Sequence, residues 1–428
     1  MSRIVVVGAT GLVGTEIATQ LAARGHAVTG IARTVPRVPS DIAWKRLDLA
    51  RAGAAAWDQV LGGVDVVVNC AGALQDSPGD DLSGVHVKGL ALLAAACRRN
   101  GVARMIHFSA MGVGGETPTA FSRSKRAGDE ALMESGVDYV ILRPSVVLAI
   151  PVAGASALIR GLAGLPVLPV MPETGPLRPV ALDDVVATVL AFTDLRRPGG
   201  LVLDMSGPET LAFVDLVRLN RRWLGLPPAR ELSVPEWLAA LAYRMGDAAG
   251  RLGWRPAVRS TARREVARGA AGDNQAWAAA TGIVPRRIEA MLRARPPAVQ
   301  DRWFARLYML KPLVFVSLVL FWVGSGLASL GPGFGGGVAM MREAGTGWLA
   351  IPIVAGGGLA DLLVGMGIAW RRTTRIALQA GIAVTAAYVV AGSVLTPWLW
   401  LDPLAALLKT LPITALMLVA LAILEERS

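Results

Sequence analysis

Apolar residues are distributed along this chain in two different patterns. Through roughly the first half, short apolar runs alternate with stretches of helical periodicity, whereas the last third contains apolar stretches of about twenty residues. Short runs bounded by turn residues predict buried strands of a parallel sheet. Runs of about twenty residues predict membrane-spanning helices. We therefore expect an α/β, Rossmann-like domain with a parallel sheet, followed by an all-α transmembrane domain.

The short runs and the helical stretches follow one another from the first residues onward. Strands are expected at 3–7, 26–32, 42–47, 64–72, 102–109, 137–142 and 201–203, and helices at 15–24, 52–61 and 85–100, with a further helix after Phe121. Such strand–helix alternation is typical of a doubly wound nucleotide-binding domain. We expect this domain to cover residues 1–225.

The turn after the first strand contains three glycines at three-residue spacing. Gly8 permits the tight turn, Gly11 lets the backbone approach a pyrophosphate, and Gly14 lets the following helix pack closely on the sheet. The first turn of that helix would face the phosphates. The predicted cofactor-binding turn therefore comprises Gly8, Thr10, Gly11, Leu12, Val13 and Gly14.

The second expected strand ends in a cation. Sites that prefer NAD usually place an acidic residue near this position, where it accepts a hydrogen bond from the ribose 2′-hydroxyl. Here the residue is Arg33, which would attract a 2′-phosphate with help from Arg37. We therefore predict that NADP(H) is preferred over NAD(H). The alternative is that Arg33 is an ordinary loop cation.

Several further motifs occur in a characteristic order. They are GATGLVG at 8–14, Asp48-Leu49, NCAG at 69–72, HFSAMG at 107–112, Lys125 and LRPS at 142–145. On these motifs, residues 1–225 resemble extended and atypical short-chain dehydrogenase/reductases, the epimerase/dehydratase-like and NmrA-like branch that includes the NADPH-binding accessory subunit of respiratory complex I. The resemblance implies that the cofactor also meets Asp48, Leu49, Ala71, Gly72, Lys125 and Pro144.

The same resemblance raises a question about catalysis. In this superfamily a tyrosine four residues before the lysine is the general acid/base, and the lysine holds the nicotinamide ribose. This chain has Lys125, but Phe121 takes the place of the tyrosine. Phenylalanine cannot transfer a proton. The implied catalytic residues are Ser109 and Lys125, and two functions stay open: an unconventional NADP-dependent oxidoreductase, and a non-catalytic NADPH-binding sensor or assembly subunit.

Cysteine content and charge exclude some classes of site. Cys70 and Cys97 are the only cysteines, too few for a disulfide framework or a zinc site, and no metal is expected. The net charge is +11, and residues 251–310 contribute most of it, with 12 Lys+Arg against 4 Asp+Glu. No nucleic-acid motif accompanies these arginines, so we expect no nucleic-acid partner. The segment either faces anionic lipid or carries ordinary solvated arginines.

Residues 226–310 form a predicted basic connecting region, mainly helical and without strand-like alternation. Within it, Trp237, Leu238, Leu241 and Met245 share one face of an amphipathic helix. This face either covers the substrate cleft, lies in the membrane interface, or packs into a core.

Residues 311–428 are expected to form the membrane domain, with four spans. These are Leu313–Leu330, Trp348–Trp370, Ile376–Leu395 and Leu404–Leu424. Cations gather before the first span and between the second and third, namely Arg302, Arg306, Lys311, Arg371, Arg372 and Arg375. By the positive-inside rule, both termini and the nucleotide domain are cytoplasmic in a multi-pass protein of a bacterial-type inner (plasma) membrane.

Two charges fall inside the expected spans. A charged side chain in the bilayer costs roughly 3 kcal/mol or more, so Asp361 and Lys409 form a predicted membrane polar site. We expect Asp361 to contact Lys409, Gln379 or a bound headgroup, with a purely structural pair as the alternative. Residues 304–424 also resemble the four-helix DoxX-like family, in which the stretch 358–367 places Asp361 at an acidic position.

Together these features suggest hydride transfer to or from a lipid-soluble partner. The lipid bilayer is the expected surroundings of the last third, and a quinone is the first substrate considered because the membrane domain would deliver it. The contrasting function is that of a sensor or subunit of a membrane protein complex, for which Phe121 argues.

Overall fold

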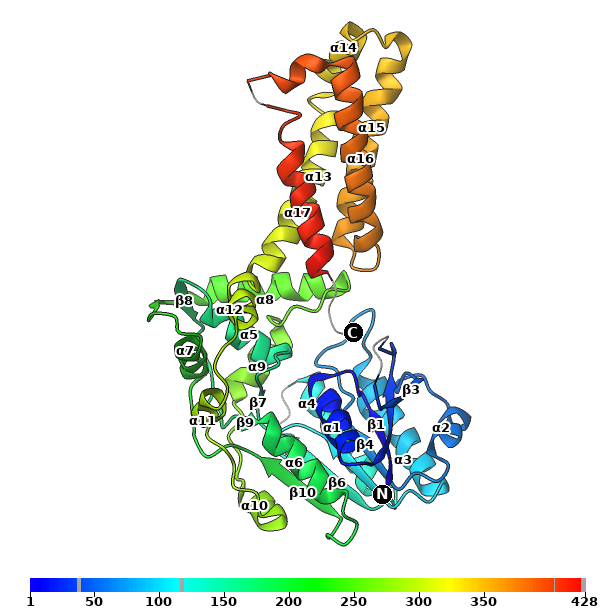
Figure 1. Ribbon diagram of the computed structural model, residues 1–428, viewed down its shortest axis with the longest axis vertical. Helices are drawn as coiled ribbons and strands as arrows, with labels where there is room; N and C mark the ends of the chain where they lie inside the picture. Colours follow the sequence, from blue (N-terminus) through cyan, green and yellow to red (C-terminus); the bar gives the residue numbers. More distant parts are fainter. Residues whose placement is uncertain (37–39, 116–118, 404, 425–428) are drawn as a thin grey trace. The chain divides into compact units, whose positions relative to one another are not determined.

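The chain folds into two compact units. The computed structural model describes residues 1–36, 40–115, 119–403 and 405–424. The first unit comprises Met1–Ala248 and Pro256–Arg306, and the second comprises Ala249–Arg255 with the chain from Leu307 onward. Both units are drawn in Figure 1. Arg37, expected to assist Arg33, lies outside the described residues.

The first unit is built around a parallel sheet of seven strands. Their order, β10-β6-β5-β4-β1-β2-β3, reverses direction between β1 and β4. The strands are β1 (Arg3–Val7), β2 (Ala27–Ala32), β3 (Ala43–Arg46), β4 (Val66–Asn69), β5 (Arg104–Phe108), β6 (Tyr139–Pro144) and β10 (Leu201–Met205). This is the predicted Rossmann-like arrangement. Ligands of such sheets bind at the carboxyl ends of the strands where the order reverses.

Helices cover both faces of this sheet (Figure 1). The helices α1 (Leu12–Ala23) and α6 (Leu182–Phe192) pack into a core with Ile4 and Val6 of β1. On the other face, α2 (Ala54–Leu61), α3 (Gly89–Arg99) and α4 (Ala120–Met133) flank the core that contains Val5 and Val7. Burial on both faces explains why β1 is apolar at consecutive positions.

The rest of the first unit is a smaller lobe of short elements. They are β7 (Val147–Leu148), α5 (Gly154–Ala163), β8 (Val167–Val170), β9 (Val180–Ala181), α7 (Phe213–Trp223), β11 (Arg230–Ser233), α9 (Ser260–Arg268), α10 (Gln275–Thr281), α11 (Ile288–Arg293) and α12 (Val299–Leu307). The region 226–310, expected to be mainly helical, also contains one short strand, β11, which pairs in parallel with β8. All four residues of β11 are exposed, so no apolar alternation marks the strand.

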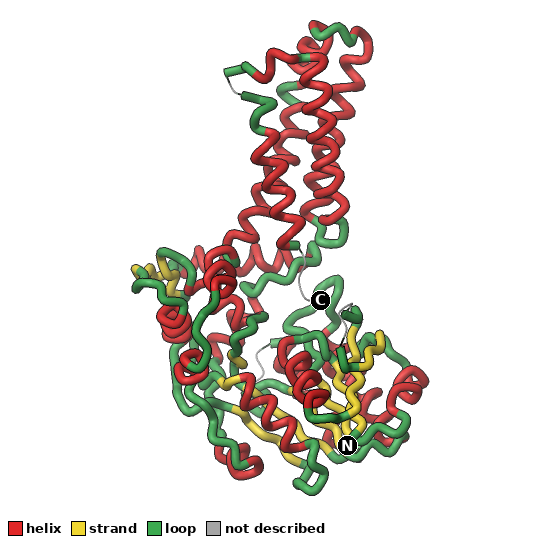
Figure 2. Tube along the Cα trace, viewed as in Figure 1, coloured by secondary structure: helices red, strands yellow, loops and turns green. Residues whose placement is uncertain are grey.

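The second unit is an elongated helical bundle (Figure 2). Three of its helices are long and apolar enough to cross a membrane: α13 (Leu310–Leu330), α15 (Ala350–Ala369) with the turn before it, and α16 (Thr374–Leu395). Less than a third of the residues in the apolar window of each helix are buried. Glycines bring α13 and α15 together, since a Cβ on Gly365 would lie 2.6 Å from Val323 Cγ2.

The fourth expected span is shorter than predicted. Its helix, α17 (Thr410–Ile423), has 14 residues, about 21 Å at 1.5 Å per residue, which is less than the ~30 Å hydrocarbon core. Pro412 lies in the first turn of α17, where a proline is tolerated because that N–H has no partner in the helix. Leu404, the expected start, lies outside the described residues. Three long helices, rather than four, therefore occur in the described part of the chain.

Candidate functional site

The glycine turn at the end of β1 accepts no side chain at two of its three glycines. Gly8 has a φ of +76°, and a Cβ on it would lie 2.8 Å from the backbone nitrogen of Ala71. A Cβ on Gly14 would lie 2.3 Å from the carbonyl oxygen of Gly8. Gly8 also donates its N–H to Ile31 O at 2.9 Å, which fixes the turn against β2. These contacts hold α1 close to the sheet.

Gly11 differs from the other two glycines. It is the N-cap of α1, with an ordinary extended conformation, and no side chain caps the helix. A Cβ on Gly11 would have only one heavy atom within 4 Å, the Gly8 carbonyl oxygen at 3.3 Å. The first turn of a helix has N–H groups without partners in the helix, and these bind anions. The turn therefore fits a pyrophosphate.

The expected adenosine-side residues lie on neighbouring strand ends. The Arg33 guanidinium donates to Gly79 O at 2.7 Å and pairs with Asp80 at 3.0 Å. Asp48 accepts a hydrogen bond from the backbone N–H of Ala50 at 3.1 Å, and Leu49 is buried. Arg33 is thus held by the 79–80 loop, and its predicted contact with a 2′-phosphate stays a prediction.

The end of β4 brings distant groups together. The Asn69 side chain accepts from the N–H of Ala71 at 3.1 Å and so fixes the backbone that leads to Gly72. A Cβ on Gly72 would lie 3.5 Å from Lys125 Nζ and 3.6 Å from His86 Nε2. Both of these side chains therefore reach the carboxyl end of β4, beside the glycine turn.

Lys125 is a buried cation on α4. Its ammonium group donates to the carbonyl oxygen of Phe108 at 2.8 Å. Burial lowers the pKa of Lys125 to about 8, although the nearby Asp129 carboxylate acts in the opposite direction. At neutral pH the group therefore carries a proton that it can release with little cost.

Ser109 lies at the end of β5, as expected, but its hydroxyl is engaged. It donates to Asp129 Oδ2 at 2.9 Å, and Arg143 donates to the same oxygen at 2.8 Å. Burial raises the pKa of the Asp129 carboxyl, while the bonds from Ser109 and Arg143 oppose that rise. Sequence reasoning missed Asp129 and Arg143. Asp129 follows Lys125 by four residues, which places both on one face of α4.

Phe121 and His86 lie at the same edge of the site. Their rings meet edge to face with centroids 5.8 Å apart. His86 Nε2 accepts from the N–H of Ala73 at 3.1 Å, which assigns the ring hydrogen to Nδ1, 2.8 Å from Ser124 Oγ. Burial, followed by the charge of Lys125, lowers the pKa of His86 to about 3. The imidazole is therefore neutral, and both of its nitrogens are occupied.

The two cysteine thiols of the first unit stay protonated at neutral pH. Cys70, between Asn69 and Ala71, is half-buried, and burial raises its pKa. Cys97 is buried, which raises its pKa to about 12. Neither thiol ionises near neutral pH, so neither is a candidate nucleophile.

The expected membrane polar site has other partners than predicted. Asp361 is buried on α15, and its carboxylate accepts from Ser325 Oγ at 2.6 Å and from the Tyr388 hydroxyl at 2.8 Å. The hydroxyl of Tyr388 also lies 3.0 Å from Gly357 O. Lys409 is exposed at the start of α17, and the contacts of Asp361 are two hydroxyl groups in place of the expected Lys409, Gln379 or headgroup.

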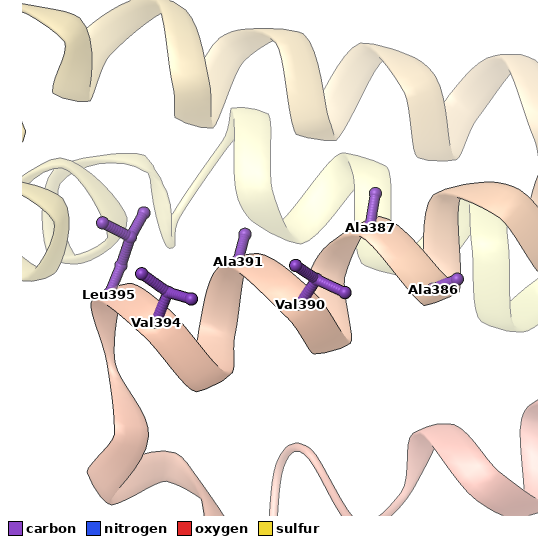
Figure 3. Close-up of a pocket in the computed structure, with 6 residues that line it drawn as sticks. All are labelled: Ala386, Ala387, Val390, Ala391, Val394 and Leu395. Atoms are coloured by element: carbon purple, nitrogen blue, oxygen red, sulfur yellow. The ribbon is translucent and has the colours of Figure 1, made fainter.

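A shallow apolar hollow of about 590 Å³ lies on α16. Figure 3 shows that one stretch of this helix supplies its lining: Ala386, Ala387, Val390, Ala391, Val394 and Leu395. None of these side chains can bind or transfer a proton. The hollow is therefore no candidate for a reacting centre.

Two family models match different parts of the chain. Residues 8–160 match a family described as NAD(P)H-binding. Residues 319–418 match the DoxX-like family. The first match contains the glycine turn and Lys125, and the second contains Asp361.

Three curated relatives are each similar to half of the chain or somewhat more. A ceramide reductase of Caulobacter vibrioides is 26% identical over 260 residues, which are 60% of this chain and 80% of the relative. A (4-alkanoyl-5-oxo-2,5-dihydrofuran-3-yl)methyl phosphate reductase of Streptomyces griseus is 28% identical over 232 residues, 52% of this chain and 74% of the relative. Subunit 9 of the NADH dehydrogenase 1 alpha subcomplex of Dictyostelium discoideum is 23% identical over 227 residues, 50% of this chain and 62% of the relative.

Solved structures share the fold. MoeE5 in complex with UDP-glucose and NAD superposes with a TM-score of 0.53 at 19% identity, covering 72% of this chain and 99% of that one. The UDP-glucose 4-epimerase of Thermotoga maritima has the same TM-score at 15% identity, with the same coverage of both chains.

Proposed function

Because the chain joins an NAD(P)H-binding domain of the atypical short-chain dehydrogenase/reductase type to a DoxX-like domain, we propose that it is a membrane-anchored reductase. Its substrate is a lipid-soluble carbonyl compound, with quinones as the first class to test. The observation that carries this proposal is the buried Lys125 ammonium beside Gly72, at the carboxyl end of β4.

The residues that would hold the dinucleotide follow from the geometry. The turn from Gly8 to Gly14 takes the pyrophosphate, Asp48 and Leu49 lie on the adenine side, and Lys125 takes the nicotinamide ribose. When bound, the cofactor supplies a hydride. NADPH is preferred because a 2′-phosphate would compete with Asp80 for the Arg33 guanidinium.

Proton supply is assigned by elimination among the described side chains at this site. Phe121 has no proton to give, the Ser109 hydroxyl donates to Asp129, and both His86 nitrogens have partners. Lys125 carries three hydrogens at neutral pH and uses one toward Phe108. Lys125 Nζ therefore gives the proton to the substrate oxygen and takes another from solvent.

The properties of the helical unit favour a lipid-soluble substrate. Its three long helices are long and apolar enough to cross a membrane, and the ceramide reductase relative is named for a lipid. Carbonyl groups of such molecules lie near the membrane surface or inside the bilayer, so a reductase tethered there meets them at high local concentration.

Both termini lie on the cytoplasmic side of a bacterial-type inner membrane in this proposal. The cations before α13 and after α15 favour that side. The end of α17 lies beside the cations that follow α15, since Arg371 donates to Leu424 O at 3.1 Å. NADPH is available in the cytoplasm, as the reaction requires.

A second function, that of a non-catalytic NADPH-binding sensor or assembly subunit, is favoured by two observations. Phe121 removes the usual acid/base, and one relative is a subunit of an NADH dehydrogenase complex. In that case the dinucleotide would stabilise the first unit, and the helices would bind a membrane complex.

NADPH oxidation by the full chain in lipid nanodiscs distinguishes the two functions. With a long-chain quinone or ketone, the reductase oxidises NADPH, and Lys125→Met slows this about 100-fold or more, the usual range for losing a proton donor. The matched control is Lys88→Met, which removes an exposed lysine from the same unit and leaves the rate unchanged. Tight NADPH binding without oxidation of any such substrate would establish the sensor instead.

A further inference from the structure

Helix α8 (Glu236–Arg251) presents an apolar face to the outside. Trp237 and Met245 are 70% and 59% exposed, and Leu238 and Leu241 are also exposed. These four side chains share one face of the helix. An exposed face of this composition is unusual for a helix packed on a water-soluble domain, and it marks an interaction site.

The opposite face of α8 holds the small and polar residues and packs into the first unit. Asp247 accepts hydrogen bonds from Gln75 Nε2 and from the N–H of Ser260, both at 3.2 Å. A Cβ on Gly246 would lie 1.8 Å from the carbonyl oxygen of Val258, so the backbone of α8 packs directly against the segment that contains Val258. These contacts fix the rotation of α8, and its apolar face cannot turn inward.

The end of α8 is fixed within the helical unit. Leu252, just after the helix, accepts a hydrogen bond from the N–H of Arg371 at 3.0 Å. Trp254 donates to Ala369 O at 2.8 Å and packs on Phe315 with ring centroids 4.7 Å apart. Ala369 is the last residue of α15, and Phe315 lies near the start of α13. The end of α8 therefore lies near the ends of α13 and α15 that carry cations.

From this arrangement we infer that the apolar face of α8 lies in the headgroup region of an anionic lipid bilayer. Tryptophan and leucine on one face, with arginines beside them, are what a helix lying in a membrane interface requires. Arg244 and Arg251, both exposed and seven residues apart, lie along one edge of the apolar face and would meet lipid phosphates.

The inference rests on the membrane anchoring in the proposed function and is independent of catalysis. A helix held flat on the bilayer would bring the residues packed against it to the membrane surface. Lipid-soluble substrates would then need to leave the bilayer only by a short distance.

Nitroxide labels on the full chain test this placement. Met245→Cys and Leu241→Cys place the label on the apolar face of α8, and Glu134→Cys, exposed at the end of α4, is the control in the same unit. The native thiols react poorly because burial raises the pKa of both Cys70 and Cys97. Collisions with oxygen and with a water-soluble nickel chelate are compared in nanodiscs of phosphatidylethanolamine and phosphatidylglycerol.

The inference predicts that labels at 245 and 241 lie about 5–10 Å below the phosphates, as for other interfacial helices, with the label at 134 in water. Equal access of the nickel chelate to positions 245 and 134 would overturn it. Protection of position 245 from both reagents would also overturn it, since a protein surface would then cover the helix. NADPH binding by the labelled variants reports that the first unit is folded, and an absence of NADPH oxidation would contradict the reductase alone.

Discussion

Two alanine substitutions in the glycine turn separate folding from dinucleotide binding. Gly11 has φ −73° and ψ 164°, which alanine adopts readily, and its added Cβ would meet only Gly8 O at 3.3 Å. Gly11→Ala should therefore change the free energy of unfolding by no more than about 1 kcal/mol. Gly14→Ala would place its Cβ 2.3 Å from the same oxygen, so it should destabilise the first unit by roughly 1–3 kcal/mol.

NADPH binding should respond in the opposite way, because Gly11→Ala should weaken it directly. The Gly11 Cβ would occupy the side of the turn that faces the pyrophosphate and weaken one or two hydrogen bonds to a charged group, worth about 1.5–3 kcal/mol. That loss corresponds to a Kd for NADPH about 10- to 100-fold higher. Titration calorimetry gives the Kd, and denaturant unfolding followed by circular dichroism gives stability. If Gly11→Ala binds NADPH as tightly as the wild type, the pyrophosphate does not lie on this turn.

Three further outcomes follow from single contacts. Because burial lowers the pKa of Lys125 to about 8, the rate of NADPH oxidation should fall about tenfold per pH unit above that value. A rate that stays constant at higher pH would exclude Lys125 as the proton donor. Arg33→Ala should raise the Kd for NADPH about tenfold, because one charge-assisted contact is lost, while the Kd for NADH changes little. An equal rise of the two Kd values would show that Arg33 does not bind the 2′-phosphate. Tyr388→Phe takes a donor from the buried Asp361 and should lower the free energy of unfolding in detergent by about 1–3 kcal/mol, whereas unchanged stability would mean that the contact is replaced.

Local patterns were sufficient for the central strands of the sheet because both of their faces are buried. The four consecutive apolar residues of β1 alternate between two cores, with Ile4 and Val6 on one side and Val5 and Val7 on the other, so the whole run is apolar. β11 carries no such pattern. Its residues are exposed, and its place is set by backbone pairing with β8, some sixty residues earlier.

Hydropathy predicted the three long apolar helices, but it predicted too long a helix for the fourth. The residues before α17 are apolar, yet Ala405 has a φ of +50° and donates to Asp402 O at 2.7 Å, so this stretch turns instead of continuing the helix. An average over twenty residues cannot register such a turn, since it counts composition and ignores backbone conformation.

The site was predictable only where one motif supplies it. Spacing indicated Gly8 and Gly14, and the family resemblance indicated Lys125, while the contact of Asp129 with Arg143 required α4 and β6 to be brought together. The expected partner of Asp361 was Lys409, Gln379 or a bound headgroup, since charged and amide groups are easy to recognise in a sequence. Hydroxyl groups, which look neutral there, form the actual contacts.

The most direct test of the reductase is the fate of a labelled hydride. The full chain in nanodiscs is incubated with stereospecifically deuterated NADPH and a long-chain quinone or ketone, and nucleotide and lipid are both analysed by mass spectrometry. The account predicts that the nicotinamide loses one of its two C4 hydrogens stereospecifically while the lipid is recovered in reduced form, and that Lys125→Met prevents both changes. Bound NADPH that remains fully reduced, beside an unchanged lipid, would contradict it.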